Sequence, residues 1–135
     1  MNKTSKPHIT LLTTNSIGFP PFVFHKAILF ETQDGQPFIL HQTTSGIEIL
    51  NYDTFLQKRH VYLRKDYILT KPFDPERIKA SETRKFDWMG YNCEDFVSKV
   101  IEQNTGKHII CKSPQRTFWM ILLALTLISL ILLRR

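Results

Sequence analysis

A chain of 135 residues, of which 42% are hydrophobic, has room for one compact domain and a tail. Its formal net charge of +6 is spread along the sequence, whereas a nucleic-acid-binding groove requires basic residues clustered on one face. Two cysteines are too few for a disulfide framework, and the polar segment 1–7 has no apolar run that could act as a secretory signal, so we expect free thiols in a reducing compartment.

The first half of the chain is predicted to form β-strands joined by turns. Strands are expected at residues 9–14, 22–30, 37–43, 47–50 and 60–67, where β-branched and aromatic residues are frequent. Glycine and prolines make residues 15–21 a loop, and the pair Asp34-Gly35 indicates the turn of a hairpin. Residues 52–58 are expected to form one or two helical turns.

Two helices are predicted to follow the strands. Asp74 and Pro75 are typical of a helix start, with Asp as N-cap and Pro at the first helical position, and this helix should run to about Lys85. The second helix should begin at Asn92 and end at Gly106. Its apolar positions form one stripe, which includes Cys93, Phe96, Val97, Val100 and Ile101, and Glu94 is expected on the polar side.

The C-terminal tail is expected to be a membrane segment. Residues 117–133 carry no charge, and Phe118 and Trp119 at one end and Arg134 and Arg135 at the other are typical interfacial anchors. A buried helix that is apolar on every face would need a larger protein around it. We therefore expect a single-pass C-terminal anchor with the preceding domain facing the cytoplasm, where the basic excess is either ordinary solvated charge or favours an anionic membrane surface.

Cys93 is a candidate nucleophile because of its place in the first turn of a helix. Unpaired N–H groups and the positive end of the helix dipole favour a thiolate there. The same turn, with Asn92 as cap and Glu94 beside the thiol, could also support an oxyanion on an attacked carbonyl. Two alternatives stay open, since a buried cysteine is commonly a small core residue and a disulfide to Cys111 is possible.

His25 and His41 are candidates for the base and its orienting partner, because thiol chemistry needs both. Both are eight residues from Gln33, so a loop of about five residues, 31–35, would place them directly opposite on one face of the hairpin. A two-residue loop at Asp34-Gly35 would instead put them on opposite faces.

Residues 91–97, Tyr-Asn-Cys-Glu-Asp-Phe-Val, resemble the Asn-Cys-Glu-His-Phe-Val signature of the lecithin:retinol acyltransferase family, a circularly permuted branch of the NlpC-type papain-like thiol hydrolases. His25 and His41 resemble that family's pair of strand histidines, and the order His, His, Cys agrees with the permuted layout. The chain departs from the family pattern at Asp95, which replaces a histidine, and in a longer hairpin loop whose glycine-rich turn is reduced to Asp34-Gly35.

The resemblance implies an α+β fold in which a small antiparallel sheet packs against helices. It implies a permuted papain-like catalytic domain at residues 1–106, followed by a linker at 107–116 and a C-terminal transmembrane helix at 117–135. A hydrophobic membrane tail is common among the phospholipid-metabolising members of the family.

The implied function is that of a membrane-anchored cysteine hydrolase or acyltransferase acting on lipid ester or amide bonds. Cys93 would attack the carbonyl, His25 would act as base and then acid, and His41 would orient His25. A thioester acyl-enzyme would then pass its acyl group to water or an amine. No metal or other cofactor is expected, and the expected partner is membrane lipid and not nucleic acid. The alternatives are a peptidase or isopeptidase of the same fold and an inactive membrane-tethered scaffold.

Overall fold

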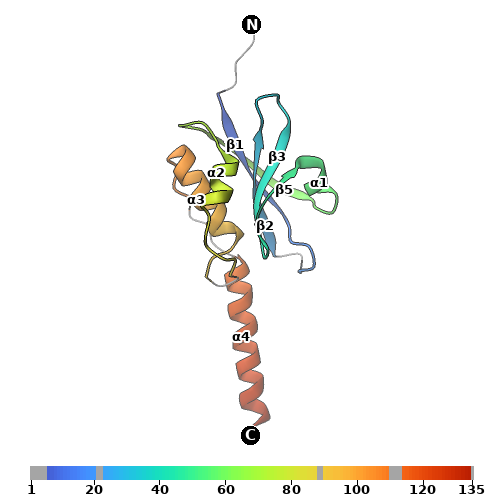
Figure 1. Ribbon diagram of the computed structural model, residues 1–135. Coiled ribbons are helices and arrows are strands. Elements are labelled where there is room, and N and C mark those ends of the chain that lie inside the picture. The colour runs from blue at the N-terminus through green and yellow to red at the C-terminus, as the bar shows by residue number, and fades with distance from the viewer. Residues whose placement is uncertain (1–5, 21–22, 88–89, 110–113, 135) are drawn as a thin grey trace.

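The chain has an α+β fold built on a five-stranded antiparallel sheet, with strand order β4-β3-β2-β1-β5 (Figure 1). The structure is a computed structural model that describes residues 6–20, 23–87, 90–109 and 114–134, without the side chains of 114–116. The strands are β1 (His8–Asn15), β2 (Phe24–Glu31), β3 (Pro37–Thr43), β4 (Gly46–Asn51) and β5 (Val61–Ile68).

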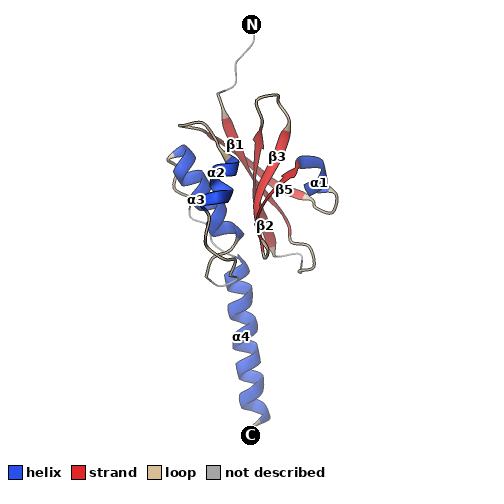
Figure 2. Ribbon diagram, viewed as in Figure 1, coloured by secondary structure: helices blue, strands red, loops and turns tan. Residues whose placement is uncertain are grey.

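The helices lie on both sides of the sheet (Figure 2). They are α1 (Tyr52–Leu56), α2 (Pro75–Ser81), α3 (Cys93–Thr105) and α4 (Pro114–Leu133). In this view α2 and α3 lie on one side of the strands and α1 lies on the other, while α4 extends away from the sheet.

The three central strands, β1, β2 and β3, are buried on both faces over most of their length, which explains why both of their faces carry apolar side chains. On one face Ile28 and Leu40 pack in a cluster with Phe96 and Val100 of α3. On the other face the core contains Leu12, Ala27, Leu29 and Ile39 together with Phe55 of α1. Successive residues of β2 therefore belong alternately to the α3 side and the α1 side, as the two-residue period of a strand requires.

All five predicted strands are confirmed, with boundaries that differ by a residue or two. The helix that begins at Pro75 ends at Ser81 and not near Lys85. Glu82 leaves the helical conformation, with φ −81° and ψ 105°, and its carboxylate accepts hydrogen bonds from Tyr91 Oη at 2.8 Å and Lys99 Nζ at 2.9 Å. These bonds tie the end of α2 to α3.

Helix α3 begins and ends where the sequence predicts. The Asn92 side chain accepts a hydrogen bond from the Glu94 N–H at 3.0 Å, and Asp95 completes a capping box by accepting from the Asn92 N–H at 3.0 Å. Gly106 ends the helix with φ 68°, a left-handed conformation that glycine adopts without strain.

Helix α3 runs along the sheet from one end to the other. Near its start, Glu94 Oε1 lies 3.9 Å from Lys26 Nζ of β2. At its other end, the carbonyl of Asn104 accepts a hydrogen bond from the N–H of Thr70, just beyond β5, at 2.9 Å. The first turn of α3 is therefore at the end of the sheet where β2 begins.

The prediction of a C-terminal transmembrane helix is wrong. Within the described residues, no helix combines the length and the apolar character that a membrane crossing requires. The uncharged part of α4 covers only residues 117–133, roughly 26 Å at about 1.5 Å per residue, whereas a hydrocarbon core measures about 30 Å. The prediction that residues 117–135 form a single-pass tail anchor is therefore wrong. The cytoplasmic orientation that was derived from it is not supported either.

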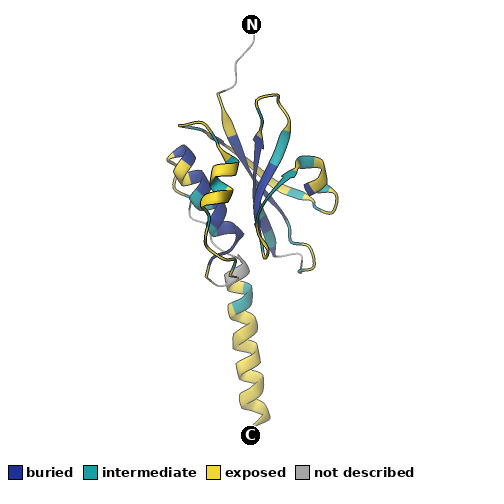
Figure 3. Ribbon diagram, in the orientation of Figure 1, coloured by how far each residue is buried: buried dark blue, intermediate teal, exposed yellow. Residues whose placement is uncertain are grey.

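The residues that were expected to anchor α4 are placed as follows. Phe118 and Trp119 contact each other edge to face, with ring centroids 5.4 Å apart, and both are partly buried. From Met120 to Arg134 the side chains are exposed (Figure 3). Arg135 and Cys111 lie outside the described residues, so the expectation for these two positions has no structural counterpart.

Candidate active site

The hairpin of β2 and β3 brings the two predicted histidines onto one face. Its register pairs Ile28 with Leu40 and Glu31 with Pro37, which leaves residues 32–36 as the loop. The loop is centred on Asp34, one residue later than predicted, so His25 and His41 are diagonal neighbours and not directly opposite. A displacement of two positions keeps both side chains on the same face, as the five-residue loop predicts.

The two imidazoles are in direct contact. His25 Nε2 lies 2.9 Å from His41 Nδ1, and the ring planes are close to perpendicular at 83°. Both side chains are buried. Phe55 of α1 packs against the pair, with its ring centroid 5.1 Å from that of His41 and 6.1 Å from that of His25. The pair therefore lies on the α1 side of the sheet, in an apolar setting that fixes both rings.

Both histidines are neutral around pH 7. Burial, followed by the charges of His41 and Arg59, holds the pKa of His25 well below 6.5. Burial and then Arg59 lower the pKa of His41 to about 4. In a pair of neutral rings joined by one contact, one nitrogen donates and the other accepts. The pair therefore retains an unprotonated nitrogen that can accept a proton.

Cys93 is the first residue of α3 and is 1% exposed. Its neighbour Glu94 contacts Lys26, and Lys26 follows His25 in the chain, so the thiol and the histidine pair belong to the same end of the sheet. The imidazoles, however, are on the α1 side whereas α3 packs on the opposite side. Thiol and imidazole can therefore meet only around the end of the sheet and not across its layer.

The cap of α3 reduces the number of backbone N–H groups in the first turn that can bind a substrate. Asn92 uses its side-chain oxygen to accept from the Glu94 N–H, so that N–H is already engaged in the capping interaction. Glu94 itself was expected on the polar side, and this expectation is wrong, because its side chain is fully buried beneath Lys26. The oxyanion role suggested for Asn92 and Glu94 stays a prediction.

Arg59 belongs to this site, although no pattern in the sequence singles it out. Its guanidinium lies 4.9 Å from the ring centroid of Phe55, and it donates a hydrogen bond to the Asn15 carbonyl at 2.9 Å. Burial lowers the pKa of Arg59, and the negative charge of a Cys93 thiolate partly opposes this. One cation thus interacts with the thiol and with both histidines, favouring a thiolate and disfavouring an imidazolium.

Glu48 is the second residue that the sequence did not reveal. It is the direct partner of His41 across β3 and β4, and its Oε2 lies 3.4 Å from His41 Nε2. The two-residue turn Thr44-Ser45, followed by Gly46 at positive φ, sets this register, and the pair Ser45-Gly46 is a recognisable sequence signal. With Glu48, the polar contacts form a row that runs from the carboxylate through His41 to His25.

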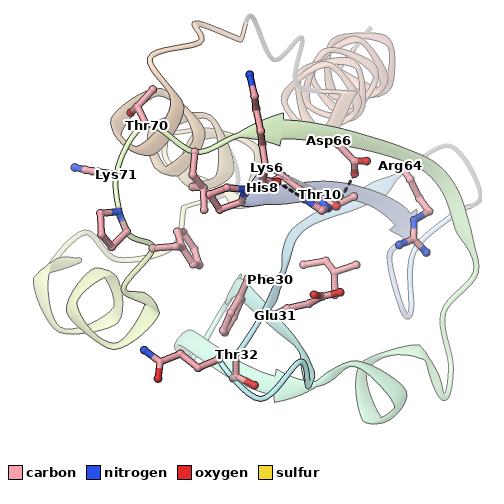
Figure 4. A pocket seen from close by; sticks show the side chains of 16 residues that line it. Lys6, His8, Thr10, Phe30, Glu31, Thr32, Arg64, Asp66, Thr70 and Lys71 are labelled. Atoms are coloured by element: carbon pink, nitrogen blue, oxygen red, sulfur yellow. Dashed lines mark hydrogen bonds between the residues drawn. The ribbon is translucent and has the colours of Figure 1, made fainter. Parts of the chain in front are cut away.

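A hollow of about 910 Å³ lies at the opposite end of the sheet (Figure 4). Lys6, His8, Phe30 and Asp66 are among the side chains that line it, and neither His25 nor His41 does. This hollow is therefore separate from the thiol and histidine arrangement. Among the described residues, no group of three or more His, Cys, Asp or Glu side chains is arranged to hold a metal ion.

Comparisons of this chain with protein families, with characterised proteins and with solved structures found no match. The likeness to the lecithin:retinol acyltransferase family therefore rests on residues 91–97 and on the two strand histidines.

Proposed function

We propose that this protein is a cysteine-dependent hydrolase or acyltransferase in which Cys93 is the nucleophile, His25 the base and His41 the residue that orients His25. The observation that carries the proposal is the 2.9 Å contact between two buried, neutral imidazoles at the end of the sheet where the helix of Cys93 begins. A nucleophile at a helix start, a neutral base and an oriented second ring are the components that thiol catalysis uses.

The chemistry proceeds in two halves. Nδ1 of His25 takes the proton of the Cys93 thiol, and the sulfur forms a bond to the substrate carbonyl carbon. As the tetrahedral intermediate collapses, the bond to the leaving oxygen or nitrogen breaks and His25 returns the proton to that atom. Water or an amine then attacks the thioester and loses its proton to His25. As the carbon–sulfur bond breaks, His25 returns that proton to the sulfur, which restores the Cys93 thiol. The sulfur must come within hydrogen-bond reach of Nδ1 for the first step.

An acyl lipid is the substrate class that we propose, with a peptide or isopeptide bond as the alternative. Apolar side chains are exposed at the same end of the sheet as His25. Phe24 and Tyr62 pack edge to face with centroids 5.5 Å apart, and Tyr62 and Ile17 are each more than half exposed. Apolar surface at this end of the sheet suits the hydrocarbon part of an acyl ester or amide.

Site-resolved alkylation tests the proposed roles. The intact protein is treated with iodoacetamide near pH 7, and modification of Cys93 is followed by mass spectrometry, with Cys111→Ser as the background so that a single thiol is present. We expect His25→Asn to slow alkylation of Cys93 by about 100-fold, the lower end of what a general base contributes. His60→Asn is the matched control, because His60 is exposed and contacts Tyr62 at the same end of the sheet.

Equal alkylation rates in the parent and His25→Asn would reject the base role, and a Cys93 that resists alkylation in the folded parent would reject the nucleophile. The substrate class is tested by incubation with a phospholipid in detergent micelles and, separately, with a peptide amide. A mass increase equal to the acyl group on Cys93, which hydroxylamine removes, identifies the thioester and its donor.

A further inference from the structure

We propose that Glu48 is a positioning residue for this thiol chemistry, because its carboxylate selects the tautomers of His41 and His25 that leave Nδ1 of His25 free to accept a proton. The inference rests on the proposed function and adds Glu48 to Cys93, His25 and His41 as a fourth residue of the site. Glu48 acts through the two rings and touches neither the thiol nor the substrate.

The geometry places Glu48 at the outer end of the row of polar groups. His41 and Glu48 face each other directly across β3 and β4, and Glu48 Oε2 is 3.4 Å from His41 Nε2. The His41 side chain is 3% exposed and that of Glu48 is 44% exposed. The carboxylate can therefore adjust its position from the solvent side, whereas the ring is fixed by β3 and by Phe55.

His41 Nε2 needs such an acceptor. It is buried, and within the described part of the chain it makes no hydrogen bond, although Glu48 Oε2 approaches to 3.4 Å. An N–H that is buried without an acceptor destabilises the tautomer that carries it. A small rotation of the Glu48 side chain converts this approach into a hydrogen bond and stabilises the tautomer with hydrogen on Nε2.

The tautomer of His41 determines the tautomer of His25. The 2.9 Å contact between His25 Nε2 and His41 Nδ1 holds one hydrogen, and by itself it is satisfied in either direction. An ionised carboxylate only accepts, so with Glu48 in place His41 carries its hydrogen on Nε2 and presents a lone pair at Nδ1. His25 must then donate from Nε2, which leaves its Nδ1 unprotonated. In the reverse arrangement His25 Nδ1 carries a hydrogen and cannot take one from a thiol.

The experiment replaces Glu48 and reads the tautomers directly. Ring nitrogens of the ¹⁵N-labelled intact protein are assigned with His25 and His41 variants, and their chemical shifts distinguish protonated from unprotonated nitrogen. We expect His25 Nδ1 to be unprotonated in the parent and to acquire protonated character in Glu48→Ala. The alkylation rate of Cys93 should fall about tenfold in Glu48→Ala, because an orienting group acts through the base and is weaker than the base itself.

Two further variants complete the test. Glu48→Gln retains an oxygen acceptor and should restore both the tautomer and most of the alkylation rate. Glu31→Ala makes the same change on an exposed strand residue at the far end of β2 and should alter neither. If Glu48→Ala folds but His25 Nδ1 is as unprotonated as in the parent, and the rate matches that of Glu31→Ala, the role of Glu48 is refuted. Failure of the proposed function is recognised separately, because His25→Asn would then leave the rate unchanged.

Discussion

Acid is expected to destabilise this protein through its buried histidine pair. The pKa of His41 is lowered to about 4 by burial and by Arg59, while the unfolded chain titrates near 6.5. Between these two values the unfolded state binds the proton and the folded state does not, so the free energy of unfolding falls as pH decreases through this window. Above about pH 7 both states are unprotonated and the contribution is constant.

The size of the effect follows from the two pKa values. Linkage between about pH 7.5 and pH 5 removes roughly 2 kcal/mol from the free energy of unfolding through His41. Burial, followed by the charges of His41 and Arg59, also lowers the pKa of His25, which adds a further loss of stability in the same direction. The pKa of Glu82 is below its ordinary value, because hydrogen bonds from Lys99, the Arg84 N–H and Tyr91 outweigh the effect of burial. Protonation of Glu82 therefore destabilises the protein only at pH values below this interval.

Urea unfolding at several pH values between about 7.5 and 5 measures this dependence. We expect the parent protein to lose stability steadily over the interval and His41→Gln to lose roughly 2 kcal/mol less. His60→Gln, a change at an exposed histidine, should keep the full dependence. A parent protein whose unfolding free energy is flat above pH 5, or a His41→Gln variant with the parent's slope, would refute the assignment of a buried neutral pair.

Other substitutions test the surroundings of the pair. Asn92→Ala removes the cap that accepts from the Glu94 N–H and should cost about 1 kcal/mol in urea unfolding, whereas Asn92→Ser should restore most of it. Tyr91→Phe removes the hydrogen bond to Glu82 and should cost about 1 kcal/mol by the same assay. Arg59→Gln should raise the pKa of His41 in an NMR titration, but not to 6.5, because burial is the larger cause.

The order and positions of the strands and helices could be predicted because local chemistry determines them. Asp74 followed by Pro75 and the pair Asn92 and Asp95 supply side-chain acceptors for helix N–H groups, and both helices begin there. Gly106 ends α3 because it adopts positive φ without strain. Signals of this kind act over four or five residues and need no knowledge of the rest of the fold.

Features that depend on distant parts of the chain were less accessible. The hairpin loop is displaced by one residue, which changes an opposed histidine pair into a diagonal one. Helical periodicity placed Glu94 on the polar side of α3, but Lys26 of β2 covers it. Arg59 reaches the site from the segment after α1, a position that no local pattern marks. In the tail, hydrophobic character was clear, but it is confined to a run too short for the predicted crossing.

The place of β2 in the sheet has a consequence for how the site can rearrange. This strand is paired to β1 over residues 24–29 and to β3 over residues 28–31, so the amides of Ile28 and Leu29, which lie in both ladders, are expected among those slowest to exchange with deuterium. His25 lies at the end of β2 that is paired to β1 alone, so its amide is expected to exchange before those of Ile28 and Leu29. The backbone that carries the base is thus expected to open before the centre of the sheet.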